Sequence, residues 1–151
     1  MSICDNRGNI ISPFVVRPVN VHDSQLFYES FCNLIELADT LDLDIKNSCF
    51  TLDSGFYNAP TRNEILLRDM TPVIKPNLRG LKDREKINKI LDEFETVSEI
   101  YKERYKIERC FAWEDTYRKL VTRYEKRQDT FMGFRYLGYS MINLRWVLGK
   151  N

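Results

Sequence analysis

The sequence lacks closely spaced histidine and cysteine residues, since it has one histidine and no C-x-x-C pair. Its four cysteines stand far apart, at Cys4, Cys32, Cys49 and Cys110. This spacing argues against a zinc site and against a disulfide framework. We therefore expect four reduced cysteines that pack in the core of a cytoplasmic protein.

Long apolar segments are also absent. The longest charge-free apolar run near the C-terminus, Tyr136 to Leu144, has nine residues, whereas a membrane-spanning helix needs about 20. Arg135 and Arg145 close this run on both sides. The first residues do not form a basic, apolar and small-residue leader, so no signal peptide is expected. We therefore expect no membrane partner.

The composition is that of an ordinary globular protein. Of the 151 residues, 43% are hydrophobic and 30% are charged, which is typical of a folded chain. One domain with one core is the default at this length, so we expect a single domain over 1–151. Within it we expect a strand–helix core over 1–77 and a helical region over 78–151.

Positive charge is concentrated near the C-terminus. Residues 101–151 contain 12 Lys and Arg against 6 Asp and Glu, whereas residues 1–100 contain 11 against 16. A basic C-terminal third suggests an anionic partner, and nucleic acid is the usual one. A solvated helix face is the plainer explanation, and composition alone favours it.

Strand and helix signals alternate in the first half. Residues 2–16 predict two short strands around a turn with Asp5, Asn6 and Gly8. A helix over 24–40, a buried strand over 47–53, a short helix over 61–70 and a strand over 71–77 come next. This alternation predicts an α/β fold with parallel pairing in at least part of a mixed sheet.

The second half carries only helical signals. A long helical region comes after the polar segment 75–83, with an expected break near Val97 and Ser98. A last helix is expected from about Thr130, and its apolar residues recur at helical spacing. That pattern predicts a packed amphipathic helix. These apolar residues are Phe131, Phe134, Leu137, Met141, Leu144 and Leu148.

Two acidic residues are candidates for chemistry. Asp53 ends a buried strand, where ligands of open α/β sheets bind, and the small Ser54 and Gly55 come directly after it. The alternative is that Asp53 only caps a turn. Glu108 lies in a basic helical segment, where an ideal helix places it within about 60° of Tyr101, Arg104 and Lys119. This stripe suggests a metal ligand beside a phosphate-binding surface, although a solvated face has the same pattern.

Several of these segments together resemble one family. The spacing Tyr101-x2-Arg104-x3-Glu108 resembles the helical signature of bacterial insertion-sequence transposases of the DDE type. The stretch DSGF, which begins at Asp53, resembles the family's second-acid motif, Asp-x-Gly-aromatic. The segments NVHDS, PVIKPN and ERCFAWEDTYRKL are also similar to the family, in the same order. The resemblance covers nearly the whole chain.

The resemblance implies a ribonuclease H-like catalytic domain. In that family two Asp and one Glu hold two divalent metal ions, Mg²⁺ or Mn²⁺, for phosphoryl transfer on DNA. Carried over, Asp53 is the second acid and Glu108 the third, while Tyr101 and Arg104 position DNA phosphates. The implied partner is double-stranded DNA at the terminal repeats of an insertion sequence, bound in the bacterial cytoplasm, and a homodimer is an open expectation.

The sequence departs from the family pattern in two places. The signature ends with a Lys seven residues after Glu108, where this chain has Asp115. We expect Lys119, and more weakly Arg118, to supply that charge. The family's first Asp lies on a strand that we expect to precede Met1, and Asp5 is the earliest acid here. We therefore expect a domain that lacks its first strand and is inactive unless an upstream segment, encoded in another frame, completes it.

Two other functions stay open. The chain could be a non-catalytic DNA-binding remnant that uses its basic segment 101–127, or a helical interaction module that uses the 131–148 stripe. For His22, capping or packing is favoured over catalysis, since two-metal phosphoryl transfer needs no histidine. Trp113 and Trp146 are expected to anchor a core, although Trp113 could instead stack on a base.

Overall fold

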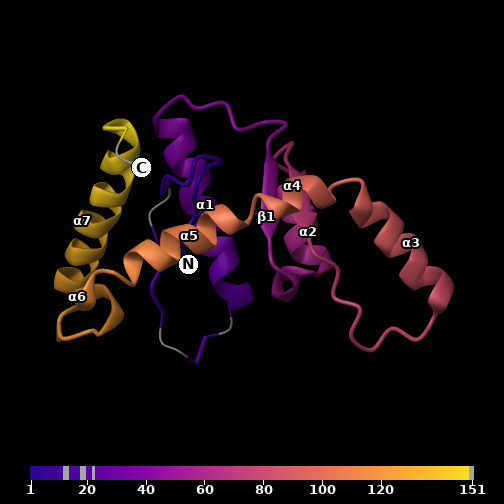
Figure 1. Ribbon diagram of the computed structural model, residues 1–151. Coiled ribbons are helices and arrows are strands. Elements are labelled where there is room, and N and C mark those ends of the chain that lie inside the picture. Colours follow the sequence, from indigo (N-terminus) through magenta and orange to yellow (C-terminus); the bar gives the residue numbers. More distant parts are fainter. Residues whose placement is uncertain (12–13, 18–19, 22, 150–151) are drawn as a thin grey trace. The chain divides into compact units, whose positions relative to one another are not determined.

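The structure is a computed structural model that describes residues 1–11, 14–17, 20–21 and 23–149 (Figure 1). The chain divides into two compact units. Unit 1 comprises Met1 and Pro13–Arg104, and unit 2 comprises Ser2–Ser12 and Tyr105–Asn151. In the part of the chain that is described, no helix combines the length and apolarity needed to cross a membrane.

Unit 1 shows the alternation of strands and helices that the sequence predicts. The break expected near Val97 is present, because α4 begins at the next residue. The elements of unit 1 are α1 (Asp23–Thr40), β1 (Cys49–Leu52), the 3-10 helix η1 (Ser54–Phe56), α2 (Ala59–Leu66), β2 (Thr71–Ile74), α3 (Arg84–Glu95) and α4 (Ser98–Lys102).

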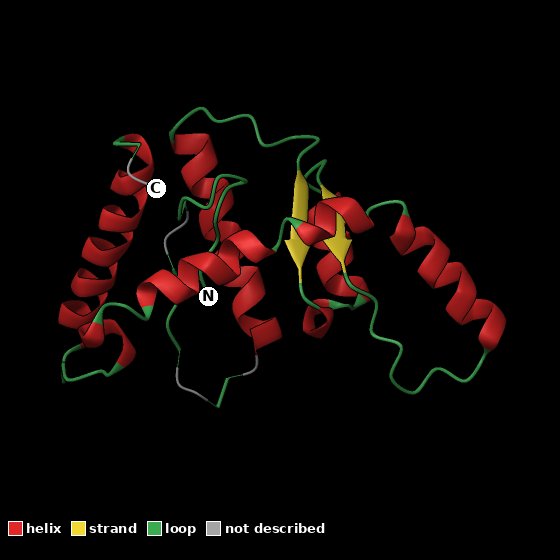
Figure 2. Cartoon of the chain, viewed as in Figure 1, coloured by secondary structure: helices red, strands yellow, loops and turns green. Residues whose placement is uncertain are grey.

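The sheet of unit 1 has two strands among the described residues. Strands β1 and β2 are parallel, with Cys49 opposite Thr71 and Leu52 opposite Ile74, and their arrows point the same way in Figure 2. Helix α2 lies between them in sequence and contacts β2, as expected for a crossover connection. The predicted parallel pairing is therefore confirmed.

The predicted N-terminal strands are reduced to one bridge. The turn is present, since Asp5 N–H donates to the Asn9 carbonyl at 2.9 Å. Beyond it, among the described residues, only the pair Cys4 and Ile10 forms an antiparallel bridge, so these residues add no strand to the sheet. Too few consecutive backbone pairs form between them to make a ladder.

Aromatic side chains build the core of unit 1. Phe27 and Phe31, one helical turn apart on α1, stack with ring centroids 5.3 Å apart. Phe50 of β1 meets Phe31 edge to face at 5.2 Å, and Phe56 of η1 lies 6.2 Å from Phe27. All four rings are buried. This cluster holds α1 and η1 against β1, and so fixes where the chain leaves β1.

Unit 2 consists of the N-terminal turn and three helices: α5 (Tyr105–Glu114), α6 (Arg118–Val121) and α7 (Gln128–Val147). The continuous helix assumed for residues 101–119 is wrong. The helical conformation stops between Lys102 and Tyr105, and again between Glu114 and Arg118. The stripe that placed Tyr101, Glu108 and Lys119 on one helix face therefore does not exist.

The expected packing face of α7 is also wrong. Phe131 is buried, but Leu137, Met141, Leu144 and Leu148 are exposed. Polar contacts turn a different face inward. The side chain of Asn143 makes hydrogen bonds to both backbone groups of Ile10. Its Oδ1 accepts from the Ile10 N–H at 2.9 Å, and its Nδ2 donates to the Ile10 carbonyl at 2.8 Å.

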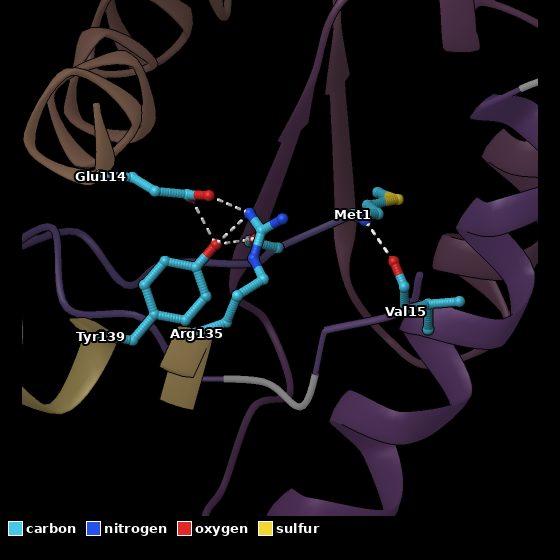
Figure 3. A network of polar contacts seen from close by, with 6 residues as sticks. Met1, Val15, Glu114, Arg135 and Tyr139 are labelled. Carbon is cyan, nitrogen blue, oxygen red and sulfur yellow. Dashed lines mark hydrogen bonds and ion pairs between the residues drawn. The ribbon is translucent and has the colours of Figure 1, made fainter. Parts of the chain in front are cut away.

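A buried polar network completes the inner face of α7 (Figure 3). The Tyr139 hydroxyl donates to Glu114 Oε2 at 2.6 Å and accepts from Arg135 at 2.9 Å. Arg135 also pairs with Glu114 Oε1, and the Ser2 hydroxyl lies 3.0 Å from that of Tyr139. Because charged groups are costly to bury alone, these contacts decide which side of α7 faces α5.

Candidate active site

A cleft in unit 1 opens where the two parallel strands end. It has a volume of about 440 Å³ and lies at the position where open α/β sheets bind their ligands. Helix α4, which contacts both strands, supplies one wall. The residues that line the cleft are Asp53, Ser54, Gly55, Phe56, Lys75, Tyr101 and Arg104.

Asp53 caps η1 and faces the cleft at the same time. Its Oδ1 accepts the Gly55 N–H at 2.9 Å, which stabilises the first turn of η1. Its Oδ2 lies 3.8 Å from the Arg104 guanidinium, and 47% of its side-chain surface is exposed. The capping role that the sequence left open is present, but it occupies one carboxylate oxygen and leaves the other directed toward the cleft.

Gly55 keeps space open beside this carboxylate. A Cβ atom at this position would lie 3.1 Å from Asp53 Oδ1, which is closer than most such contacts in proteins. This contact accounts for a small residue at position 55, and the expectation that small residues after Asp53 admit a ligand stays a prediction. Any larger residue would have to displace the side chain of Asp53.

The cleft wall from α4 carries Tyr101 and Arg104. The Tyr101 ring meets Phe94 of α3 edge to face at 5.3 Å, so Tyr101 has a packing role besides lining the cleft. Arg104 comes just after the end of α4, and its side chain is 26% exposed. Its contact with Asp53 is long and partly solvated, so it contributes little to stability.

Lys75 is a cleft residue that the sequence patterns did not identify. It comes directly after β2, just as Asp53 comes directly after β1. Because Leu52 is paired with Ile74, Asp53 and Lys75 are the next residues along two adjacent parallel strands. The signal was present in the stretch PVIKPN, but its meaning depends on the register between the strands, which the sequence alone does not contain.

The other predicted site residues belong to unit 2. Glu108 lies in the first turn of α5 and is exposed, and Arg118, the first residue of α6, is exposed too. Lys119 lies in α6, and its side chain is outside the described part. Asp115 comes just after the end of α5 and is exposed. Of the predicted site residues, the cleft of unit 1 thus combines Asp53, Tyr101 and Arg104.

Asp5 is fully used by its own turn. Its Oδ1 accepts the N–H groups of Arg7 and Asn9, at 2.9 and 2.8 Å, and its Oδ2 accepts the Asn9 side-chain amide at 2.8 Å. These contacts agree with the turn chemistry expected from the sequence. They leave Asp5 poorly placed to serve as a metal-binding acid.

Two further predictions concern His22 and the tryptophans. His22 lies outside the described residues, and so does the side chain of Trp146. Trp113 is half-buried, and the Arg145 guanidinium lies 4.8 Å from its ring centroid. This cation–π contact ties α5 to α7 and supports the anchoring role.

The carboxylates of Asp53 and Glu108 have the donor chemistry that Mg²⁺ and Mn²⁺ prefer. Each is at least partly exposed to solvent, and Asp53 directs one oxygen into the cleft. Within the described residues, however, no three acidic, cysteine or histidine side chains gather closely enough to hold a metal ion. The cleft by itself offers one carboxylate beside two cations.

Comparison with known proteins gives one match. Residues 1–141 match the family model described as the transposase DDE domain. No curated protein and no solved structure matches the chain.

Proposed function

Since the chain belongs to the family of transposase DDE domains, we propose that it acts in DNA transposition, by metal-dependent cleavage and joining of strands at insertion-sequence ends. The observation that carries this proposal is the cleft at the strand ends. It presents the Asp53 carboxylate together with Tyr101, Arg104 and Lys75. The family also implies a ribonuclease H-like fold, with which the parallel pair β1 and β2 agrees.

The cations of the cleft would hold the DNA backbone. Arg104 and Lys75 place two positive charges beside the single negative charge of Asp53, so the cleft attracts a phosphate group. A guanidinium binds phosphate through two parallel hydrogen bonds, whereas an ammonium acts as a point charge. Arg104 would therefore orient the phosphate and Lys75 would add affinity. Arg118 and Lys119 would contact phosphates elsewhere along the DNA.

Asp53 and Glu108 are the residues that would hold divalent metal ions. When bound, a pair of such ions stabilises the attacking and leaving oxygens of an in-line displacement. Asp53 can accept a ligand without losing its capping bond, because that bond uses only Oδ1. We propose that cleavage needs a further carboxylate besides these two.

The chain alone is therefore expected to bind DNA but to cleave it negligibly. The test is incubation of purified chain with an end-labelled duplex in Mg²⁺ or Mn²⁺, followed by denaturing electrophoresis. Appreciable Mg²⁺-dependent strand cleavage by this chain would refute the need for another acid.

Neutralising Asp53 tests its assignment as a metal ligand. Asp53→Asn keeps an oxygen that can accept the Gly55 N–H but loses the charge. We expect Mn²⁺ to bind at least about tenfold more weakly, by analogy with lost metal ligands, while duplex DNA binds as tightly as before or more tightly. Electron paramagnetic resonance of free Mn²⁺ measures the first quantity. The matched control is Asp92→Asn on the exposed face of α3, which should change neither.

A non-catalytic DNA-binding role is the first alternative. Glu108→Gln tests it against the catalytic proposal. Under either function, simple DNA binding by this variant should stay intact or become stronger, so the difference lies in cleavage. In an enzyme to which a further carboxylate is supplied, Glu108→Gln should abolish cleavage. Retained cleavage in that variant would remove Glu108 from the metal site.

One observation favours a second function, as an interaction module. Four apolar residues of the C-terminal stripe that were expected to be packed are exposed: Leu137, Met141, Leu144 and Leu148. We propose that a second copy of the chain covers this face. Leu137→Asp combined with Met141→Asp should then lower the apparent mass in sedimentation analysis without weakening DNA binding. A monomeric mass for both the parent chain and the double variant would exclude the homodimer.

A further inference from the structure

Helix α3 has an apolar face that the rest of unit 1 leaves largely uncovered. Its 12 residues are all described, and none of them is buried. Its apolar residues form one face, because an ideal helix places them within about 100° of one another. They are Ile87, Ile90, Leu91 and Phe94. Phe94 contacts Tyr101 of α4, but Leu91 is 43% exposed, and the two isoleucines are only half-buried.

This face continues into a groove beside α3. The groove has a volume of about 270 Å³, and Ile90, Glu93 and Phe94 line it on the side of α3. Most of its other lining residues come from α2 and β2, among them the exposed Leu66 and the buried Ile74. The apolar surface open to a partner is therefore larger than α3 alone.

The charges at the two ends of α3 oppose its own dipole. Arg84 and Lys86 lie in the first turn, and Glu93 and Glu95 lie in the last turn, which has no basic residue. The helix dipole favours the reverse order, with acids near the N-terminus and cations near the C-terminus. Glu85 of the first turn is favourably placed, but the other four charges do not stabilise the helix that carries them. Their arrangement needs another physical reason.

These four charges flank the apolar face as two pairs. On an ideal helix, Arg84 and Glu95 lie about 60° and 80° to one side of Ile87. Lys86 and Glu93 lie about 100° and 120° to the other side. Each flank thus has a cation toward the N-terminus and an acid toward the C-terminus, and the two pairs share one midpoint along the helix.

We propose that α3 pairs in antiparallel direction with α3 of a second copy of the chain. A two-fold axis at the shared midpoint brings each flank of one helix onto the same flank of the other. Arg84 then meets Glu95 of the second copy, and Lys86 meets Glu93 of the second copy. Each contact occurs twice, so four ion pairs border the two apolar faces, as in antiparallel coiled coils. A parallel pair would instead place cation against cation and acid against acid.

This pairing is separate from the contact proposed for α7 and does not rest on a role in transposition. A chain with two self-pairing faces can form assemblies larger than a dimer. Charge reversals confined to α3 therefore provide the test.

Two variants reverse the flanks of α3. Arg84→Glu with Lys86→Glu makes both flanks acidic, and Glu93→Lys with Glu95→Lys makes both flanks basic. Each change agrees with the helix dipole, so α3 itself should not be weakened. Each variant alone should self-associate at least about tenfold more weakly than the parent chain, because four ion pairs become four repulsive pairs. An equimolar mixture of the two variants should associate as the parent does.

Energy transfer between donor-labelled and acceptor-labelled full-length chains measures this association. The dyes are attached to Cys49, which is exposed on β1, contrary to the expectation that all four cysteines pack in the core. Transfer in the parent and in the mixture, at concentrations where each variant alone shows little, supports the antiparallel pair. Equal transfer in all four samples would mean that another face joins the copies and would overturn the proposal. Absence of transfer in the parent or in the mixture would overturn it too.

The matched control reverses charges on the far side of the same helix. Lys89 and Asp92 are exposed, and an ideal helix places both about 150° from the centre of the apolar face. Lys89→Glu with Asp92→Lys should therefore self-associate as the parent does. A loss in this control as large as in the flank variants would contradict the pairing geometry.

Discussion

At the scale of single residues, the site is defined by the residue that comes directly after each strand. Asp53 and Lys75 are the first residues after β1 and β2, and both line the cleft with Arg104. Asp53 combines a local role, the cap of η1, with an oxygen directed toward the cleft. Lys75 is exposed, and its place at the mouth of the cleft suggests that its role is to bind an anion.

Lys75→Ala tests this role. Loss of one phosphate contact should weaken duplex binding at low salt several-fold and make its salt dependence shallower by about one unit of log–log slope. Fluorescence anisotropy over a salt series measures both quantities. Lys89→Ala, on the exposed surface of α3, is the matched control. Equal losses in the two variants would mean that Lys75 contributes only net charge.

Tyr139 carries a prediction about pH. Burial, and then its hydrogen bond to Glu114, raise the pKa of the Tyr139 hydroxyl. The folded state therefore holds this proton more tightly than the unfolded state, whose pKa is about 10. The resulting stability is fully present below about pH 10 and is lost as the pH rises through the higher folded value.

The measurement is urea unfolding of the parent chain and of Tyr139→Phe, at about pH 8 and at several values above about 10, the unfolded pKa of tyrosine. The free energy of unfolding should fall more steeply with rising pH in the parent than in the variant, which has no hydroxyl to ionise. Parallel curves for the two proteins would show that Tyr139 does not contribute to the alkaline loss of stability.

At the scale of elements, α7 shows how polar contacts can overrule an apolar pattern. The helix turns Tyr139, Ile142 and Gly138 inward, and Gly138 lets α6 approach closely. A Cβ at this position would lie 2.7 Å from Leu120 Cδ1. Gly133, on the same helix, would meet no described atom within 4 Å. Close packing against Leu120 therefore requires a glycine at position 138, whereas no such packing requires one at position 133.

Substitution of each glycine by alanine tests this difference in packing. Gly133→Ala should raise the free energy of unfolding by about 0.5–1 kcal/mol, because alanine favours the helix at an exposed position. Gly138→Ala should lose this gain and destabilise by about 1 kcal/mol or more, because the buried Leu120 must move. Chemical denaturation measures both, and a similar stabilisation in both variants would mean that Leu120 can move at little cost.

At the scale of the whole molecule, charge is divided along the sequence. The change from a net acidic to a net basic chain near residue 100 nearly coincides with the boundary between the units after Arg104. Under the proposed function, DNA contacts come from both units: Lys75 and Arg104 from unit 1, and Arg118 and Lys119 from unit 2.

Four such contacts predict a measurable salt dependence. The logarithm of the binding constant for duplex DNA should fall with the logarithm of salt concentration with a slope of about −3 to −4. Titration of a labelled duplex at several salt concentrations gives the slope. A slope near −2 would indicate that only one of the two units contacts DNA, and a slope near −1 that binding depends on a single phosphate.

The sequence by itself was enough for features that depend on neighbouring residues. The order of strands and helices in unit 1, the strand end at Asp53, the turn around Gly8 and the family resemblance all rest on local patterns, and the family match over residues 1–141 bears out that resemblance. Local backbone preferences and short hydrogen bonds produce such features, so they can be read from short segments.

Only the tertiary structure decided which distant residues meet. The strand register brings Lys75 beside the Asp53 position, folding brings the Gly8 carbonyl to the Cys110 thiol, and a buried ion pair with Glu114 selects the inner face of α7. Helical periodicity also failed to show the breaks after Lys102 and Glu114. The physical reason is that periodicity reports which conformation a segment prefers, whereas these contacts depend on packing and on the cost of burying polar groups between segments far apart in the chain.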